Sequence, residues 1–218
     1  MDRPRVCVSI VDGNIDKIKE VESLADLFEV RIDLIGDSWR TLVRKLNKPW
    51  IACNRCMEEG GKWNKSEAER LQELFTALEL GATIVDIELR TEKLEEAVTK
   101  IKESAECLLS YHELNCTPSI DEMKEIVQRQ INAGADICKV VTTATKFEDN
   151  SAMLQVISSF LDNRIVSFAM GEKGMLSRFL CPIVGGDFTY ASMTEGMESA
   201  PGQITIESLR DLYGMVLK

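Results

Sequence analysis

The chain has 218 residues, of which 26 are Lys or Arg and 36 are Asp or Glu, so its formal net charge is −10. This length is enough for one large domain with a substantial core. The charge argues against nucleic acid or an anionic membrane as partner, although local arginines can still bind a small anionic molecule. The N-terminus carries no signal-peptide pattern, and no apolar run reaches the length of a membrane span, so we expect a cytoplasmic protein.

Strand-like and helix-like segments alternate along the whole chain. The β-rich runs are 6–11, 28–35, 49–55, 83–89, 107–114, 136–144, 164–170 and 188–192. Helical periodicity covers 14–25, 38–46, 66–80, 91–104, 119–133, 150–160, 175–183 and 205–216. Pro118 and Ser119 open the fifth helix, and Gly81 and Gly134 follow the third and fifth.

Alternating strands and helices favour a parallel sheet, and eight such units fit a (β/α)8 TIM barrel. At 218 residues the barrel is compact, since about 250 is typical. We predict one domain over residues 1–218. An open doubly wound sheet is the main alternative, but no GxGxxG motif opens a helix after the first strand.

Charged residues recur late in the strands, where the active site of such a barrel lies. Glu29, Arg31 and Asp33 share one face of the second strand by period two, and Asp86 and Glu88 share one face of the fourth. The third strand ends at Arg55 and leads to Glu59. This placement predicts a polar barrel mouth. For Asp33, Asp86 and Glu88, a buried salt-bridge network that only fixes strand register is the alternative.

Lys139 and His112, the only histidine, lie near the ends of successive strands. A lysine in an apolar strand is costly unless its amine is used or paired, and pairing with Glu88 or Asp86 is one possibility. The other is catalysis: burial lowers a lysine's pKa, and a neutral amine can form an imine with a carbonyl. Imidazole can then act as general acid and base.

The last quarter of the chain supplies anion-binding groups. Arg178, after the seventh strand, has the forked geometry that suits a carboxylate. The polar loop 193–203 follows the eighth strand and is expected to act as a lid; the alternative is a connection of no consequence.

Of the seven cysteines, Cys53 and Cys56 have CxxC spacing. No second CxxC and no spare histidine complete a zinc site, so we predict reduced thiols and no metal.

With these residues in hand, the chain resembles the type I 3-dehydroquinate dehydratases over nearly its whole length. The matching segments are 29–33, 55 with 59–61, 86–89, 110–112, 139, 170–178 and 200–203. The resemblance implies a (β/α)8 lyase of the shikimate pathway that needs no metal or cofactor. It would convert 3-dehydroquinate to 3-dehydroshikimate by syn elimination through a lysine imine. It also implies a homodimer.

The resemblance also implies a role for each matching residue. Lys139 would form the imine, His112 would move the protons, and Glu59 would orient His112. The substrate would be bound by Glu29, Arg31, Arg55, Met170, Arg178, Ser199 and Gln203. The chain departs from longer members in starting almost at its first strand, so we expect it to lack their N-terminal hairpin.

Two other functions are compatible with the sequence. A class I aldolase also uses a lysine imine in a (β/α)8 barrel, but usually needs a phosphate site after strands seven and eight. A carboxylate-binding barrel without catalysis would use Lys139 and His112 only as compensating core residues.

Overall fold

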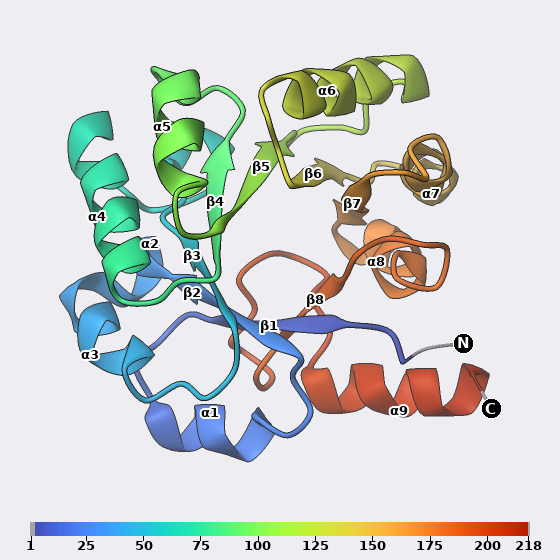
Figure 1. Ribbon diagram of the computed structural model, residues 1–218. Coiled ribbons are helices and arrows are strands. Elements are labelled where there is room, and N and C mark those ends of the chain that lie inside the picture. The colour runs from blue at the N-terminus through green and yellow to red at the C-terminus, as the bar shows by residue number, and fades with distance from the viewer. Residues whose placement is uncertain (1–2, 218) are drawn as a thin grey trace.

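The computed structural model describes residues 3–217; residues 1–2 and 218, which the predicted domain includes, lie outside this range. Parallel strands form one eight-stranded sheet in the order β7-β6-β5-β4-β3-β2-β1-β8. Helices surround this sheet, which confirms the predicted (β/α)8 barrel (Figure 1). The strands are β1 Val6–Ile10, β2 Leu27–Arg31, β3 Trp50–Cys53, β4 Ile84–Glu88, β5 Glu106–His112, β6 Ile137–Thr143, β7 Arg164–Met170 and β8 Thr189–Ser192.

The seam between β7 and β8 is where the barrel closes. The Asp187 backbone N, just before β8, donates to Ile165 O of β7 at 2.8 Å. Asp187 also pairs with Arg164 across the seam at 2.9 Å and with Arg5 at 2.7 Å. These contacts hold the two strands together at the end of the barrel where the strands begin.

The helices are α1 Ile15–Val21, α2 Ile32–Ile35, α3 Trp39–Val43, α4 Glu67–Glu79, α5 Leu94–Ile101, α6 Ile120–Asn132, α7 Asp149–Ser158, α8 Met175–Leu180 and α9 Ile206–Val216. The two longest, α4 and α6, each begin with a capping box: Ser66 with Glu69, and Ser119 with Glu122. Each N-cap contributes about 1 kcal/mol to the helix.

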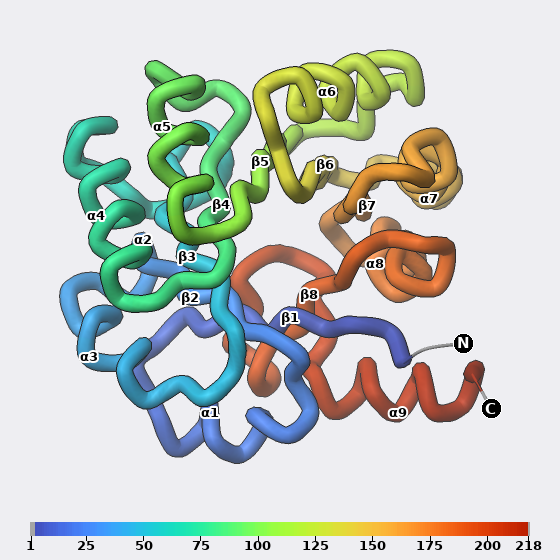
Figure 2. Tube along the Cα trace, viewed as in Figure 1, coloured from blue at the N-terminus to red at the C-terminus, as the bar shows by residue number. Residues whose placement is uncertain are grey.

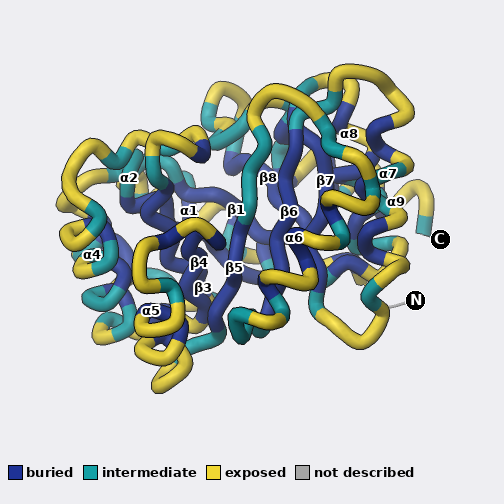
Figure 3. Tube along the Cα trace, turned by 90° about the horizontal axis from the view of Figure 1, so that it is seen from above, coloured by how far each residue is buried: buried dark blue, intermediate teal, exposed yellow. Residues whose placement is uncertain are grey.

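Two apolar layers make up the core. Inside the barrel, apolar residues from the strands, and Phe188 just before β8, pack below the mouth; they include Cys7, Leu27, Ile51, Ile84, Leu108, Ile137, Val166 and Phe188. A larger layer lies between sheet and helices. The buried strands therefore occupy the centre of the molecule and exposed backbone its rim (Figure 3). Because successive strand residues face opposite layers, polar residues late in a strand can point into the barrel mouth.

The second strand is shorter than the sequence predicts. β2 ends at Arg31, and the predicted strand residues 32–35 form the helical turn α2. Asp33 turns back to accept from Arg31 at 2.7 Å and from the Lys62 backbone N at 3.0 Å. These bonds end the strand, and Gly36, with φ 69°, redirects the chain.

The tube in Figure 2 shows the chain winding once around the barrel, so that the segment leading into β1 and the end of α9 lie near one another. Figure 3 shows the same proximity from a second direction. Among the helices of residues 3–217, none is both long enough and apolar enough to cross a membrane.

Candidate active site

A cavity of about 270 Å³ opens at the C-terminal ends of the strands. All ten residues predicted for the site line it: Glu29, Arg31, Arg55, Glu59, His112, Lys139, Met170, Arg178, Ser199 and Gln203. They come from strand ends and following loops that are far apart in the sequence. The barrel therefore brings together the predicted set, whose chemical roles are argued below.

Lys139 lies within β6 with its side chain inside the barrel and is only 4% exposed. Its Nζ donates to Asp86 Oδ2 at 2.9 Å and to Tyr190 Oη at 3.1 Å, and lies 3.6 Å from Glu29 Oε1. Of the two partners considered for it, Asp86 is the one it has. Glu88 pairs with arginines instead.

The protonation of Lys139 differs from the expectation based on burial. Burial does lower the pKa of this amine, but the negative charges of Asp86 and Glu29 outweigh burial and raise the pKa above 10.5. The resting side chain is therefore an ammonium ion. A base must take one proton before Nζ can attack a carbonyl.

His112 ends β5 beside a buried carboxylate. Glu59 Oε2 accepts from the His112 backbone N at 3.0 Å and lies 2.7 Å from Nδ1. A carboxylate accepts from Nδ1–H, which leaves the lone pair on Nε2. Burial, then the charges of Arg55 and Lys139, lower the pKa of His112 well below 6.5. The imidazole is therefore neutral at neutral pH and can take a proton.

Glu59 belongs to the short turn Met57–Glu59 after β3 and is 3% exposed. Its Oε1 lies 2.8 Å from Arg90 Nε. Burial raises the pKa of Glu59 to about 7, against the opposing charges of Arg55 and Arg90. The turn depends on Gly61, because a Cβ there would lie 2.0 Å from Arg55 O.

Arg178 is 1% exposed, and its Nε and Nη2 have no hydrogen-bond partner among the described residues. Its guanidinium lies 4.3 Å from the centre of the Phe168 ring. Burial lowers its pKa to about 10, so it stays positive at neutral pH. An unpaired buried cation is costly, and a carboxylate in the cavity would remove that cost.

The other two arginines are held by carboxylates. Arg55 donates to Asp86 at 2.7 Å and to Glu88 at 2.9 Å, and Arg31 pairs with Asp33 at 2.7 Å. The salt-bridge network considered for these carboxylates therefore exists. Its arginines, Arg31 and Arg55, are among the residues that line the cavity, whereas its carboxylates are not, so the carboxylates act as the framework that holds the arginines.

The loop after β8 lies against the cavity. Gly171 N donates to Pro201 O at 3.0 Å, and Gln203 Oε1 accepts from the Ser199 N at 2.7 Å. Gln203 Nε2 donates to Ser9 Oγ at 3.3 Å. Gly202 has φ 76°, and a Cβ there would lie 2.5 Å from Gly171 O, so the close approach requires glycine.

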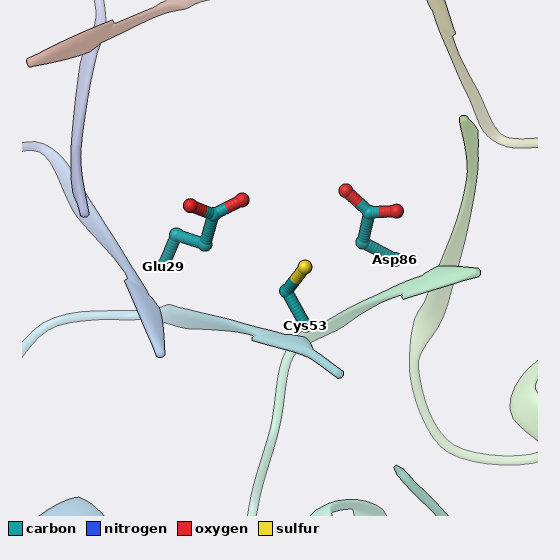
Figure 4. A group of neighbouring side chains, drawn as sticks. All are labelled: Glu29, Cys53 and Asp86. Atoms are coloured by element: carbon teal, nitrogen blue, oxygen red, sulfur yellow. The ribbon is translucent and has the colours of Figure 1, made fainter. Parts of the chain in front are cut away.

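One group in residues 3–217 has the spacing of metal ligands: Glu29, Cys53 and Asp86, whose side chains point toward one another inside the barrel (Figure 4). Cationic groups of the protein already occupy it. Asp86 Oδ2 accepts from both Arg55 and Lys139, and Cys53 Sγ accepts from Arg55 at 3.3 Å. Burial raises the pKa of Cys53 well above 9, so it is a thiol. A carboxylate that already accepts from two cationic side chains, next to a protonated thiol, does not suit the binding of a metal ion.

The two cysteines with CxxC spacing are Cys53 and Cys56. Burial raises the pKa of Cys56 to about 12 and that of Cys53 well above its usual range. Both are therefore protonated at neutral pH, as the reduced thiols predicted from sequence would be.

Besides Asp86, which the sequence analysis considered only as a partner for Lys139 or as part of a salt-bridge network, two residues near the reacting groups are missing from the predicted set. Tyr190 Oη lies 3.1 Å from Lys139 Nζ, and Arg90 Nε lies 2.8 Å from Glu59 Oε1. Period two along 188–192 puts Phe188 and Tyr190 on one face, so Tyr190 could have been found from its strand. Arg90 lies beyond the end of β4, where alternation gives no orientation.

Comparison with known proteins gives consistent results. The profile described as type I 3-dehydroquinase matches residues 6–218. A 3-dehydroquinate dehydratase of Dehalococcoides mccartyi is 41% identical, over 99% of this chain and 97% of its own. Another, of Methanocaldococcus jannaschii, is 36% identical over 97% of this chain and 98% of its own.

Solved structures agree in fold. The type I 3-dehydroquinate dehydratase of Clostridium difficile, solved with covalently modified comenic acid, superposes with a TM-score of 0.88. The alignment covers 99% of this chain and 93% of that one, at 23% identity. At this identity the likeness shows that both chains share the barrel.

Proposed function

Because this chain belongs to the type I 3-dehydroquinase family, its reaction is the dehydration of 3-dehydroquinate, and we propose that it proceeds through an imine on Lys139. The protein is thus a hydro-lyase of the shikimate pathway, and the aldolase and binding-protein alternatives are set aside. One observation supports the proposal most: Arg178, whose buried Nε and Nη2 have no hydrogen-bond partner within residues 3–217, shares a cavity with a lysine and a histidine. Such a cavity suits a substrate that has a carboxylate for the arginine, a ketone that reacts with the lysine amine, and a proton that the histidine can transfer.

The proposed reaction begins with activation of the nucleophile. Lys139 gives up a proton, for which the neutral imidazole of His112 is the available acceptor, and the free amine attacks the C3 ketone. Loss of water gives the iminium, which acidifies the protons on C2. His112 removes one of them and then protonates the C1 hydroxyl as it leaves. Hydrolysis of the imine releases 3-dehydroshikimate and restores Lys139.

The remaining lining residues bind and enclose the substrate in this proposal. Arg178 binds the carboxylate, and Met170 packs on the ring. Glu29, Arg31 and Arg55 shape the pocket for the ring hydroxyls, with Arg31 and Arg55 held in place by their carboxylates. Ser199 and Gln203 close over the substrate from the loop after β8.

The same proposal covers the domain organisation, the oligomeric state and the location of the protein. Residues 1–218 act as a single catalytic domain without a metal or cofactor. Family resemblance supports a homodimer, which sedimentation velocity can test. The enzyme is proposed to be cytoplasmic, and its net charge of −10 argues against binding to nucleic acid or to an anionic membrane surface.

The decisive experiment mixes the protein with 3-dehydroquinate, follows the absorbance of the enone product, adds borohydride and maps the reduced adduct by mass spectrometry. Product absorbance and an adduct on Lys139 are expected. A Lys146→Ala variant, which removes an exposed lysine beyond the same strand, should trap as the parent does. Product without an adduct would contradict the imine, and no product would contradict the reaction itself.

Arg178→Ala should mainly raise KM. A charge-assisted hydrogen bond to the substrate carboxylate contributes about 1.5–3 kcal/mol, or roughly 10- to 150-fold in KM. Since Arg178 has unpaired nitrogens, its loss should not lower the melting temperature. Steady-state kinetics and thermal melts test both points, with the exposed Arg44→Ala as control. An unchanged KM would place the carboxylate elsewhere.

The turnover number should fall as pH drops through about 7. Below this value Glu59 takes up a proton, since burial raises its pKa to about 7, and the negative charge that favours a proton on His112 is lost. The charged or titratable groups around Glu59 are Arg55, Asp86, Glu88, Arg90 and His112. Removing a cation from this group should raise the pKa of Glu59 further.

The pH profile of kcat for the parent, Arg90→Gln and Glu59→Gln tests this expectation. Arg90→Gln should move the acid limb to higher pH, by less in high salt because Arg90 is half exposed. Glu59→Gln should remove the limb. If the acid limb stays in place in both variants, it arises from the titration of a group other than Glu59.

A further inference from the structure

Tyr190 is a buried residue of the cavity to which the reaction described above assigns no role. It lies in β8, 3% exposed, with its Oη 3.1 Å from Lys139 Nζ and its ring centre 4.4 Å from the same atom. Phe168 and Phe188 pack edge-on against the ring, with centroids 6.0 and 5.4 Å away. The hydroxyl is therefore held in place beside the amine that reacts.

The direction of the Tyr190 O–H bond follows from the charge on Lys139. An ammonium group has only donors, so Oη accepts the hydrogen bond from Nζ and its own proton must point elsewhere. Within residues 3–217, no other group shares a hydrogen bond with this hydroxyl. Tyr190 lines the cavity, so the free O–H is available to a substrate bound there. A buried hydroxyl with an unused donor is costly when no ligand fills that position.

A carbinolamine on Lys139 would place an acceptor within reach of that donor. Its oxygen and nitrogen share one carbon atom, so a hydroxyl 3.1 Å from the nitrogen can form a hydrogen bond to the oxygen when the oxygen is on the Tyr190 side of that carbon. Negative charge builds on this oxygen as the amine adds to the ketone. A fixed donor there stabilises the transition state more than the ground state.

We propose that Tyr190 is a catalytic residue of imine formation and hydrolysis, where its hydroxyl donates a hydrogen bond to the carbinolamine oxygen; this rests on the imine proposed above. The amine forms the C–N bond, the carbonyl π electrons move to oxygen, and that oxygen takes a proton which the nitrogen gives up. A second proton, taken earlier from Lys139 by His112, then leaves with the hydroxyl as water. Tyr190 keeps its proton throughout.

Tyr190→Phe removes the hydroxyl and preserves the ring, so it isolates this function. In a single turnover quenched with borohydride at successive times, adduct on Lys139 and enone product should both appear about 10²-fold more slowly than in the parent. Tyr213→Phe is the matched control, since it removes a buried hydroxyl that donates to Phe179 O outside the cavity. The control should react at the parent's rate.

Adduct formation at the parental rate in Tyr190→Phe would overturn the proposal. Absence of any adduct in the parent would instead overturn the imine itself, so the two failures are distinguishable. Difluorotyrosine at position 190 offers a second test that retains the hydroxyl and makes it more acidic. A rate of adduct formation equal to or above the parent's supports the donor, and a rate as slow as that of Tyr190→Phe overturns it.

Discussion

Lys139→Ala abolishes the dehydration and leaves the barrel folded: turnover should fall on the order of 10⁴- to 10⁶-fold, as expected for loss of a covalent nucleophile. Lys139 is the only lysine that lines the cavity among the described residues, so no neighbouring amine can replace it. Without the iminium, the protons on C2 are far less acidic, and His112 alone cannot remove them at a useful rate.

The fold should survive because the carboxylate next to Lys139 keeps other partners. Asp86 still accepts from Arg55 at 2.7 Å and from Ser110 at 2.6 Å, and Glu29 still accepts from Ser9 at 2.9 Å. No buried carboxylate is therefore left alone, which is the usual cause of severe destabilisation.

Circular dichroism and thermal melts should show a folded Lys139→Ala protein, while the enone assay and borohydride trapping should be silent. Lys139→Met controls for lost side-chain volume and should be equally inactive. Lys146→Ala should retain full activity, since that lysine is exposed and outside the cavity lining. If Lys139→Ala kept even a tenth of the parental turnover, an imine at this position would not be the route.

The fold could be predicted because its signal is periodic. Eight alternating strand and helix segments correspond to the eight parallel strands, and period two put Glu29 and Arg31, which both line the cavity, on one face of the second strand. The end of β2 could not be predicted, since the segment 32–35, apolar except for Asp33, suits a strand as well as a helical turn. Asp33 bonding to Lys62 N, far along the chain, determines the outcome.

The position of the site could also be predicted, because side chains at the C-terminal ends of parallel strands meet at one mouth. The charge states could not. The pKa of Lys139 is raised because Asp86 and Glu29 lie close in space, although burial alone suggests a lowered value. In the same way, no pattern shows that Arg178 lacks a partner for Nε and Nη2.

These charge states have a common consequence for mechanism. In the resting protein Lys139 is protonated and His112 is neutral. Imine formation needs the reverse, a neutral amine on Lys139 and a protonated imidazole on His112 that can act as an acid. Transfer of one proton between them, when substrate binds, would activate both together. The carboxylate of Glu59 on Nδ1 favours this transfer, because it stabilises the imidazolium that results.

His112→Ala should separate imine formation from elimination. We expect kcat to fall about 10²- to 10⁴-fold, the usual contribution of a general acid–base group, while Lys139 still forms a borohydride-trappable adduct with the substrate. Nothing else in the described residues places an imidazole in the cavity, since the chain has one histidine. Substrate should therefore accumulate as an imine that loses its C2 proton slowly.

Mass spectrometry of the trapped protein distinguishes this outcome from a general loss of binding. A substrate-mass adduct on Lys139 should predominate in His112→Ala, because solvent can take the proton of Lys139 in place of His112, although more slowly, whereas the C2 proton then has no base placed to remove it. Glu59→Gln is the companion variant: it leaves the imidazole and replaces only the carboxylate beside Nδ1, so its kcat should fall between those of His112→Ala and the parent. Near-parental turnover in His112→Ala would exclude this histidine as the base, and loss of the adduct together with turnover would show that it is needed first to deprotonate Lys139.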